Sequence, residues 1–225
     1  MYKKLNLGCL FLIFFMLLGE RGECQMRSLP DDNLRYPVII DLYIKNQRIS
    51  AGSGFFLNSE KSIYLITAKH VIFKDDNGNE LLSPRAAVCS YPRDINVNDS
   101  IDLELNLEEL QKNNFLFKHQ LRDIVAIKIA EVDDKKEAKA LPGVVVLKMQ
   151  PSGIVGLSIK GIKLFEDVLI GNDVFVFGYP VSLSGKGVEE VDFRKPLLRK
   201  GIIAGKDSKN KVIILDCFVN KGNSG

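Results

Sequence analysis

The sequence predicts an all-β protein, and two observations lead to this expectation. After residue 25, the 225-residue chain consists of short apolar runs broken by turn residues, which is the pattern of strands joined by turns. Residues 58–61 form a polar turn with an apolar run on each side, which indicates a β-hairpin. No repeat of fixed period and no low-complexity tract interrupts this pattern.

Strands are expected wherever turn residues bound an apolar run. In the first half of the chain these are residues 36–44, 52–57, 62–67, 86–91, 101–107 and 124–130, with a turn at 75–79 and a short helical turn within 108–118. The charged segment 131–139 has no apolar period, so it is predicted to connect two β modules. In the second half the expected strands are 143–149, 154–160, 173–177, 199–204 and 212–217, with loops at 178–180 and 184–187. The second module looks short by a strand or two.

The composition excludes one large class of partners. The hydrophobic content of 46% and the charged content of 26% are ordinary for a globular protein. The net charge of +3 includes Lys3 and Lys4, so the rest of the chain is close to neutral. We find no stripe of basic and aromatic residues, and no nucleic-acid partner is expected.

The N-terminal segment is typical of a secretory signal peptide. Lys3 and Lys4 precede an apolar run at 7–18, and small or polar residues follow it. A run of this length is short for a bilayer span, which needs about 20 residues. Residues 1–24 are therefore predicted to be a cleaved signal, so that the protein is secreted or periplasmic without stable membrane association. An uncleaved anchor is the alternative.

The cysteines leave two arrangements open. Cleavage of the signal would retain Cys89, Cys217 and, depending on the cleavage site, Cys24. Export permits a disulfide, but two buried free thiols explain Cys89 and Cys217 equally well. No cysteine or histidine cluster has the spacing of metal ligands, so neither a metal nor a cofactor is expected.

One histidine and one aspartate have neighbours that favour a catalytic role. His70 ends an apolar run just after Thr67 and Ala68, whereas His119 lies in a polar stretch and is interpreted as a structural histidine. Asp123 begins the apolar run 124–129, where a carboxylate is costly to bury unless a group such as an imidazole pairs with it. The alternative for Asp123 is a solvent-facing residue at the start of a strand.

A serine near the end of the chain is the third candidate catalytic residue. Gly222 and Gly225 bracket Asn223 and Ser224, which allows a tight turn and a close approach to a substrate. Successive N–H groups in such a turn can form a nest for a developing negative charge. A serine hydroxyl needs a histidine to take its proton and a carboxylate to orient that histidine. Taken alone, the tetrapeptide is an ordinary turn.

Six motifs in one order carry a family resemblance. They are GSGF at 52–55, TAKHV at 67–71, DIVA at 123–126, FGYP at 177–180, GIIAG at 201–205 and GNSG at 222–225. Together they resemble the chymotrypsin-like serine proteases, in particular the exported trypsin-like branch with the heat-shock periplasmic proteases and glutamyl endopeptidases. The likeness covers about residues 36–225. It implies two packed six-stranded antiparallel β-barrels with the active site between them.

The resemblance also implies an activity and its residues. His70 would be the general base, Asp123 would orient it, Ser224 would be the nucleophile, and the N–H groups of Gly222 and Ser224 would form the oxyanion hole. The implied reaction is hydrolysis of peptide bonds in proteins or peptides through an acyl-enzyme. In domain terms, residues 25–130 would form the barrel that carries His70 and Asp123, and residues 131–225 the barrel that carries Ser224.

Two departures from the family limit this interpretation. The family normally has a second glycine and a proline after the serine, and then closing strands, so the second barrel is expected to be truncated and the chain to be a fragment. Asn223 replaces an aspartate, so no activation by a freshly cut N-terminal amine is expected. The alternatives are a catalytically idle trypsin-like binding module, an inactive fragment of a longer protease, and an anchored structural protein.

Overall fold

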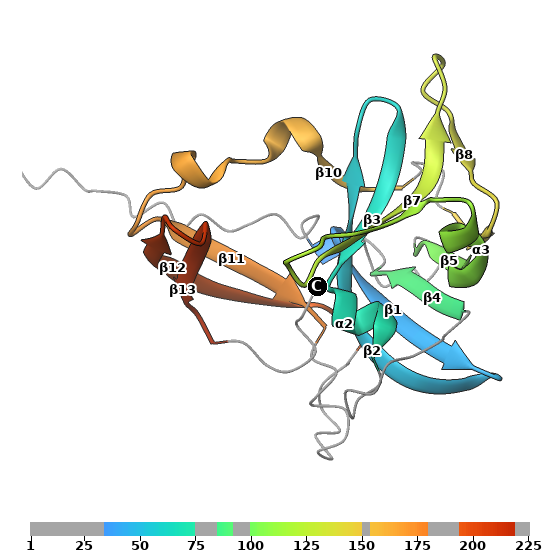
Figure 1. The fold of residues 1–225 in the computed structure, drawn as a ribbon, viewed down its shortest axis with the longest axis horizontal. Helices are drawn as coiled ribbons and strands as arrows, with labels where there is room; N and C mark the ends of the chain where they lie inside the picture. The colour runs from blue at the N-terminus through green and yellow to red at the C-terminus, as the bar shows by residue number, and fades with distance from the viewer. Residues whose placement is uncertain (1–33, 75–84, 92–99, 150–153, 180–193, 219–225) are drawn as a thin grey trace, which may run out of the picture. The chain divides into compact units, whose positions relative to one another are not determined.

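The computed structural model describes residues 34–74, 85–91, 100–149, 154–179 and 194–218, and in this part of the chain the fold is mostly β with short helices (Figure 1). The strands form two sheets, one of ten strands and one of three. The predicted all-β class is confirmed, and a curled antiparallel sheet with a second sheet is consistent with the two-barrel arrangement. Among the described residues, no helix has the length and apolar character needed to cross a bilayer.

The first sheet contains most of the described strands. They are β1 (Pro37–Ile44), β2 (Gln47–Asn58), β3 (Ser62–Thr67), β4 (Arg85–Ser90), β5 (Asp102–Asn106), β6 (Leu116–Lys118), β7 (Val125–Val132), β8 (Ala138–Ala140), β9 (Val144–Lys148) and β10 (Leu157–Ser158). Their order is β6-β7-β3-β2-β1-β4-β5-β9, with β8 paired to β7. All pairs are antiparallel except β10, which runs parallel to β2.

The predicted hairpin joins β2 and β3. Asn58 pairs with Ile63, and the intervening turn is closed by Ser59, whose hydroxyl donates to the Ser62 carbonyl at 2.9 Å and accepts from the Ser62 N–H at 3.0 Å. The hairpin prediction is confirmed. It matters for the site because Gly54 of β2 lies opposite Thr67, the last residue of β3.

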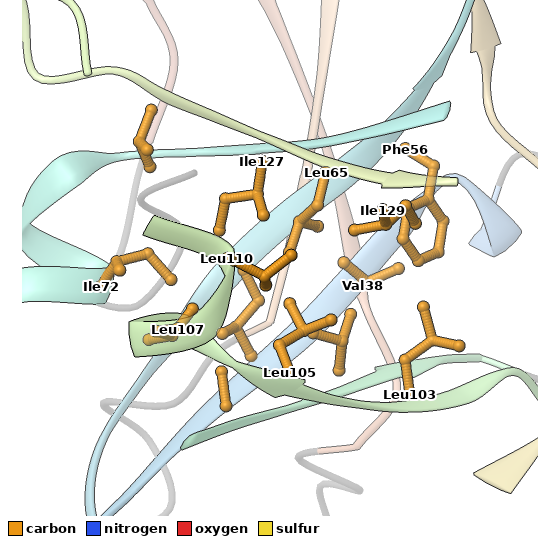
Figure 2. Close-up of a cluster of buried hydrophobic side chains, with 14 of the residues drawn as sticks. Val38, Phe56, Leu65, Ile72, Leu103, Leu105, Leu107, Leu110, Ile127 and Ile129 are labelled. Carbon is orange, nitrogen blue, oxygen red and sulfur yellow. The ribbon is translucent and has the colours of Figure 1, made fainter. Parts of the chain in front are cut away.

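The hydrophobic core is enclosed by the first sheet and two short helices. In β3 and β7, buried residues alternate with half-buried ones, as expected for strands with one face on a core. Figure 2 shows Leu65 and Ile127 from these strands in one cluster with Ile72 and Leu110 from the helices. All four are at most 1% exposed. This packing fixes the two strands whose ends carry the candidate site.

One of the two helices was predicted from the sequence and the other was not. Helix α3 (Leu107–Lys112) confirms the predicted helical turn, and its N-cap Asn106 accepts a hydrogen bond from the Glu109 N–H at 3.1 Å. Helix α2 (Lys69–Phe73) was not predicted from the sequence. With five residues it is too short to display a helical period, yet it buries Val71 and Ile72 in the core.

The second sheet consists of β11 (Asp173–Gly178), β12 (Leu197–Asp207) and β13 (Val212–Asp216), paired antiparallel in that order. These strands confirm the predictions at 173–177, 199–204 and 212–217. Two 3₁₀ turns, η3 (Ile159–Gly161) and η4 (Phe165–Asp167), precede the sheet. Every residue of β13 is exposed, so the described core belongs mainly to the first sheet.

Two local predictions are wrong. Residues 131–139 contain a hairpin between β7 and β8, which is closed where the Asp133 carboxylate accepts the N–H groups of Lys135 and Glu137 at 2.9 Å. Side-chain capping of a tight turn explains why this segment has no apolar period. The strand expected at 154–160 is only the two-residue β10 followed by η3. The domain boundaries at residues 24 and 130 stay predictions.

Candidate active site

His70 is placed by the end of β3. The Thr67 hydroxyl donates a hydrogen bond to the Ser53 carbonyl at 2.7 Å, and both residues are buried. Ala68 continues in an extended conformation as the N-cap of α2, so that His70 becomes the second residue of the helix. The local sequence at 67–71 therefore ends a strand and starts a helix within two residues, and the histidine lies just beyond the end of β3.

Asp123 is placed by the start of β7. Strands β3 and β7 are antiparallel neighbours, and Thr67 at the end of β3 pairs with Val125 at the start of β7. Residues that follow Thr67 and residues that precede Val125 therefore leave the sheet at the same end. This register brings His70 and Asp123 together although 53 residues separate them in the sequence.

Asp123 binds His70 with both carboxylate oxygens. The His70 Nδ1 lies 2.5 Å from Oδ2, and the His70 backbone N–H donates to Oδ1 at 3.0 Å. The backbone of Lys69 also donates to the carboxylate. The side chains of His70 and Asp123 are 43% and 55% exposed, so the pair is open to solvent and to a reacting group.

This geometry selects one tautomer of the imidazole. A carboxylate only accepts hydrogen bonds, so Nδ1 of His70 is the donor in the pair. In the neutral ring, Nε2 then has a free lone pair and can accept a proton. The arrangement can therefore serve as a general base held in orientation by an acid residue.

The surroundings of Asp123 favour its ionised form. Partial burial acts to raise the pKa of Asp123, but the hydrogen bonds from the His70 ring and backbone, the charge of His70 and the backbone of Lys69 together outweigh it. The net result is a pKa below the usual range of an aspartate. A carboxylate that stays ionised can continue to hold the histidine as the solution becomes mildly acidic.

Ser53 connects the site to the segment after β11. The Tyr179 N–H donates to the Ser53 hydroxyl at 2.8 Å, and Tyr179 is fully buried. The Tyr179 hydroxyl also lies 3.4 Å from the Pro37 carbonyl oxygen. Two of the six sequence motifs, at 52–55 and 177–180, therefore meet through Ser53, which also accepts the hydrogen bond of Thr67.

The loop that leads to Asp123 contains His119, which was predicted to be a structural histidine. His119 accepts hydrogen bonds at Nδ1 from the backbone N–H groups of Leu121 and Arg122, at 3.1 and 2.9 Å. Its carbonyl accepts the ammonium of Lys69 at 3.0 Å. His119 is thus a hydrogen-bonded structural residue, as interpreted, but its partners lie next to the candidate site. In the sequence, the only indication of this position was the spacing of four residues between His119 and Asp123.

The other predicted site residues lie outside the described part of the chain. Ser224, the proposed nucleophile, and Gly222, the proposed oxyanion donor, belong to residues 219–225, so their roles stay predictions. The turn at 75–79 is also outside the described residues. Within the described ranges, no group of three or more His, Cys, Asp and Glu side chains could hold a metal ion.

The open question about the cysteines has a partial answer. Cys89 and Cys217 are free thiols and both are half-buried. Burial, followed by the hydrogen bond and charge of Asp102, raises the pKa of Cys89 to about 12. Cys89 is therefore protonated and unreactive near neutral pH.

Comparison with known proteins identifies a family and a similar solved structure. Residues 52–225 match the family described as trypsin-like peptidase domain. Among solved structures, the serine endoprotease from Yersinia pestis is similar, with 18% sequence identity and a TM-score of 0.46. That match covers 88% of this chain and 52% of the other, so the chain spans about half the length of that protease. No curated protein matches the sequence significantly.

Proposed function

The chain belongs to the trypsin-like peptidase domain family, and on this basis we propose that it is a serine endopeptidase that hydrolyses peptide bonds through an acyl-enzyme. The observation that carries the proposal is the pair of hydrogen bonds between His70 and one carboxylate, that of Asp123. A bond to both the ring and the backbone of a histidine fixes its orientation as well as its tautomer. That is the requirement for a general base in this chemistry.

In the proposed reaction, the Ser224 hydroxyl attacks the carbonyl carbon of the scissile bond while His70 Nε2 takes its proton. The tetrahedral intermediate collapses, the C–N bond breaks, and His70 returns the proton to the leaving amine. Water then attacks the ester by the same route, with His70 again as base, and releases the carboxylic acid and free Ser224. Asp123 stabilises the imidazolium in both halves of the reaction.

The backbone N–H groups of Gly222 and Ser224 are the proposed donors to the oxyanion. Each such donor typically contributes about 3 kcal/mol to transition-state stabilisation, because it is already oriented before the negative charge develops. The substrates are proteins or peptides, as expected for this family. We further propose that the protein is exported by residues 1–24, as in the exported branch that the sequence resembles.

The proposal is tested with a fluorophosphonate probe and an unstructured protein substrate. The wild-type protein should be labelled at Ser224, as located by mass spectrometry, and should cleave the substrate. Ser224→Ala should abolish labelling and turnover together. Ser208→Ala is the matched control, because Ser208 is exposed in the turn between β12 and β13 and should leave both unchanged.

The outcomes separate the proposal from its alternatives. Turnover that persists in Ser224→Ala would disprove the serine mechanism. A folded wild-type protein that neither reacts with the probe nor cleaves the substrate would indicate an idle binding module or an inactive fragment. Sequencing the N-terminus of protein recovered from outside the cytoplasm tests export separately, since an intact leader would contradict cleavage at residue 24.

A further inference from the structure

We infer that His119 is a positioning residue, which holds the loop carrying Asp123 in the geometry needed to orient His70; this inference rests on the proposed function. The sequence context of His119 does not indicate a catalytic role. Its importance comes from the loop between β6 and β7, residues 119–124, in which Asp123 is the fifth residue.

The ring of His119 organises this loop through one atom. Nδ1 accepts hydrogen bonds from the N–H groups of both Leu121 and Arg122, at 3.1 and 2.9 Å. An imidazole nitrogen accepts only when it carries no proton. The neutral ring with its proton on Nε2 therefore satisfies two backbone donors just before Asp123.

The backbone of His119 closes the same loop on both sides. Its N–H donates to the Ile124 carbonyl at 3.0 Å, which joins the two ends of the loop. Its carbonyl accepts the Lys69 ammonium at 3.0 Å. Lys69 immediately precedes His70, so the segment with the base and the segment with the carboxylate are bonded to one residue.

Hydrophobic burial does not hold this loop. All residues from 119 to 124 are exposed, and Leu121 and Ile124 are 88% and 49% exposed. An exposed loop without buried side chains depends on its hydrogen bonds for a defined conformation. The bonds of His119 are therefore expected to determine where the Asp123 carboxylate lies.

The test compares two substitutions with a matched control. His119→Ala removes the acceptor, whereas His119→Asn keeps an acceptor oxygen at the position of Nδ1. We expect kcat of His119→Ala to fall about 10- to 100-fold at unchanged KM, because a displacement of about 1 Å is enough for such a loss. His119→Asn should restore most of the activity, and Gln120→Ala in the same loop should behave as wild type.

A further measurement distinguishes positioning from a general loss of structure. In NMR spectra, the His70 Nδ1 proton and slow amide exchange at Leu121 and Arg122 should be lost in His119→Ala and kept in His119→Asn. The spectra do not require turnover, so they decide the inference even if the proposed peptidase activity is absent.

The inference is overturned if His119→Ala keeps wild-type kcat and the His70 Nδ1 signal, or if His119→Asn is as impaired as His119→Ala. Should His119→Ala fail to fold, His119→Gln replaces it, because its acceptor lies one bond further from the backbone. Equal behaviour of the Asn and Gln variants in spectra and in kcat would then contradict the inference.

Discussion

Gly52 packs directly against Val71, the residue that follows His70. A Cβ atom at residue 52 would lie 2.5 Å from Cγ2 and 2.7 Å from Cγ1 of Val71, which is closer than real Cβ contacts allow. Val71 is 2% exposed and β-branched, so it has little freedom to move aside. The absence of a side chain at residue 52 is therefore a condition for the position of α2.

Gly52→Ala should lower the free energy of unfolding by about 1–3 kcal/mol through overpacking. Val71→Ala removes both clashing methyl groups, so the double variant should be more stable than the sum of the single effects predicts, by about 0.5–3 kcal/mol. Urea denaturation of the four proteins completes the cycle. Additive effects would show that a side chain at residue 52 does not clash with the methyl groups of Val71.

Asp123→Asn should impair catalysis far more than it perturbs structure. The amide oxygen can still accept the His70 backbone N–H, which leaves the amide nitrogen opposite Nδ1 and favours a proton on Nε2 instead. His70 then cannot take a proton from Ser224, and kcat should fall by about 10⁴-fold, as for this substitution in related triads. Kinetics with a peptide substrate measure the effect. An Asn variant within tenfold of wild type would contradict the role of Asp123.

The lowered pKa of Asp123 also predicts a pH-dependent difference in stability. A carboxyl whose pKa is lower in the folded than in the unfolded state stabilises the fold above the unfolded value, about 3.9. Wild type should therefore be more stable than Asp123→Asn near neutral pH, and the difference should disappear as the pH falls through the lowered folded-state value. Because Asp123 is 55% exposed, the difference should be about 1 kcal/mol or less.

Urea denaturation of both proteins between pH 7 and 3 measures this difference. Ser208→Ala, in the exposed turn between β12 and β13, serves as the control and should show no such trend. A difference that grows toward acid would mean that the pKa of Asp123 is raised instead of lowered.

The longer strands of the first sheet and the His70–Asp123 pair could be predicted from the sequence. Alternating burial leaves a visible apolar pattern in strands such as 62–67 and 125–132, and their ends mark where polar site residues can gather. The three-residue strands β6 and β8 could not be predicted from the sequence. Strands this short have no apolar pattern of their own and depend on their pairing with β7.

The contact between Tyr179 and Ser53 could not be predicted from the sequence. The hydrogen bond from Tyr179 to Ser53 joins residues 126 positions apart, and neither side chain type predicts the other. His119 illustrates a different difficulty. A histidine in a polar stretch has the same sequence context whether it faces solvent or caps a functional loop, and only the geometry at Leu121 and Arg122 distinguishes the two.

Cys89 provides a test of the environment inside the first sheet. It lies on β4 opposite Asp102 of β5, and burial together with that carboxylate raises its pKa to about 12. Alkylation requires the thiolate, so iodoacetamide should modify Cys89 in the native protein at pH 8 far more slowly than in urea. Peptide mapping by mass spectrometry measures both rates.

Asp102→Asn removes a negative charge that opposes ionisation of Cys89 and should speed the native reaction. The reaction should stay slower than in urea, because burial, the largest cause of the shift, persists. Equal rates in the native wild type and in urea would show that Cys89 is not protected by the fold.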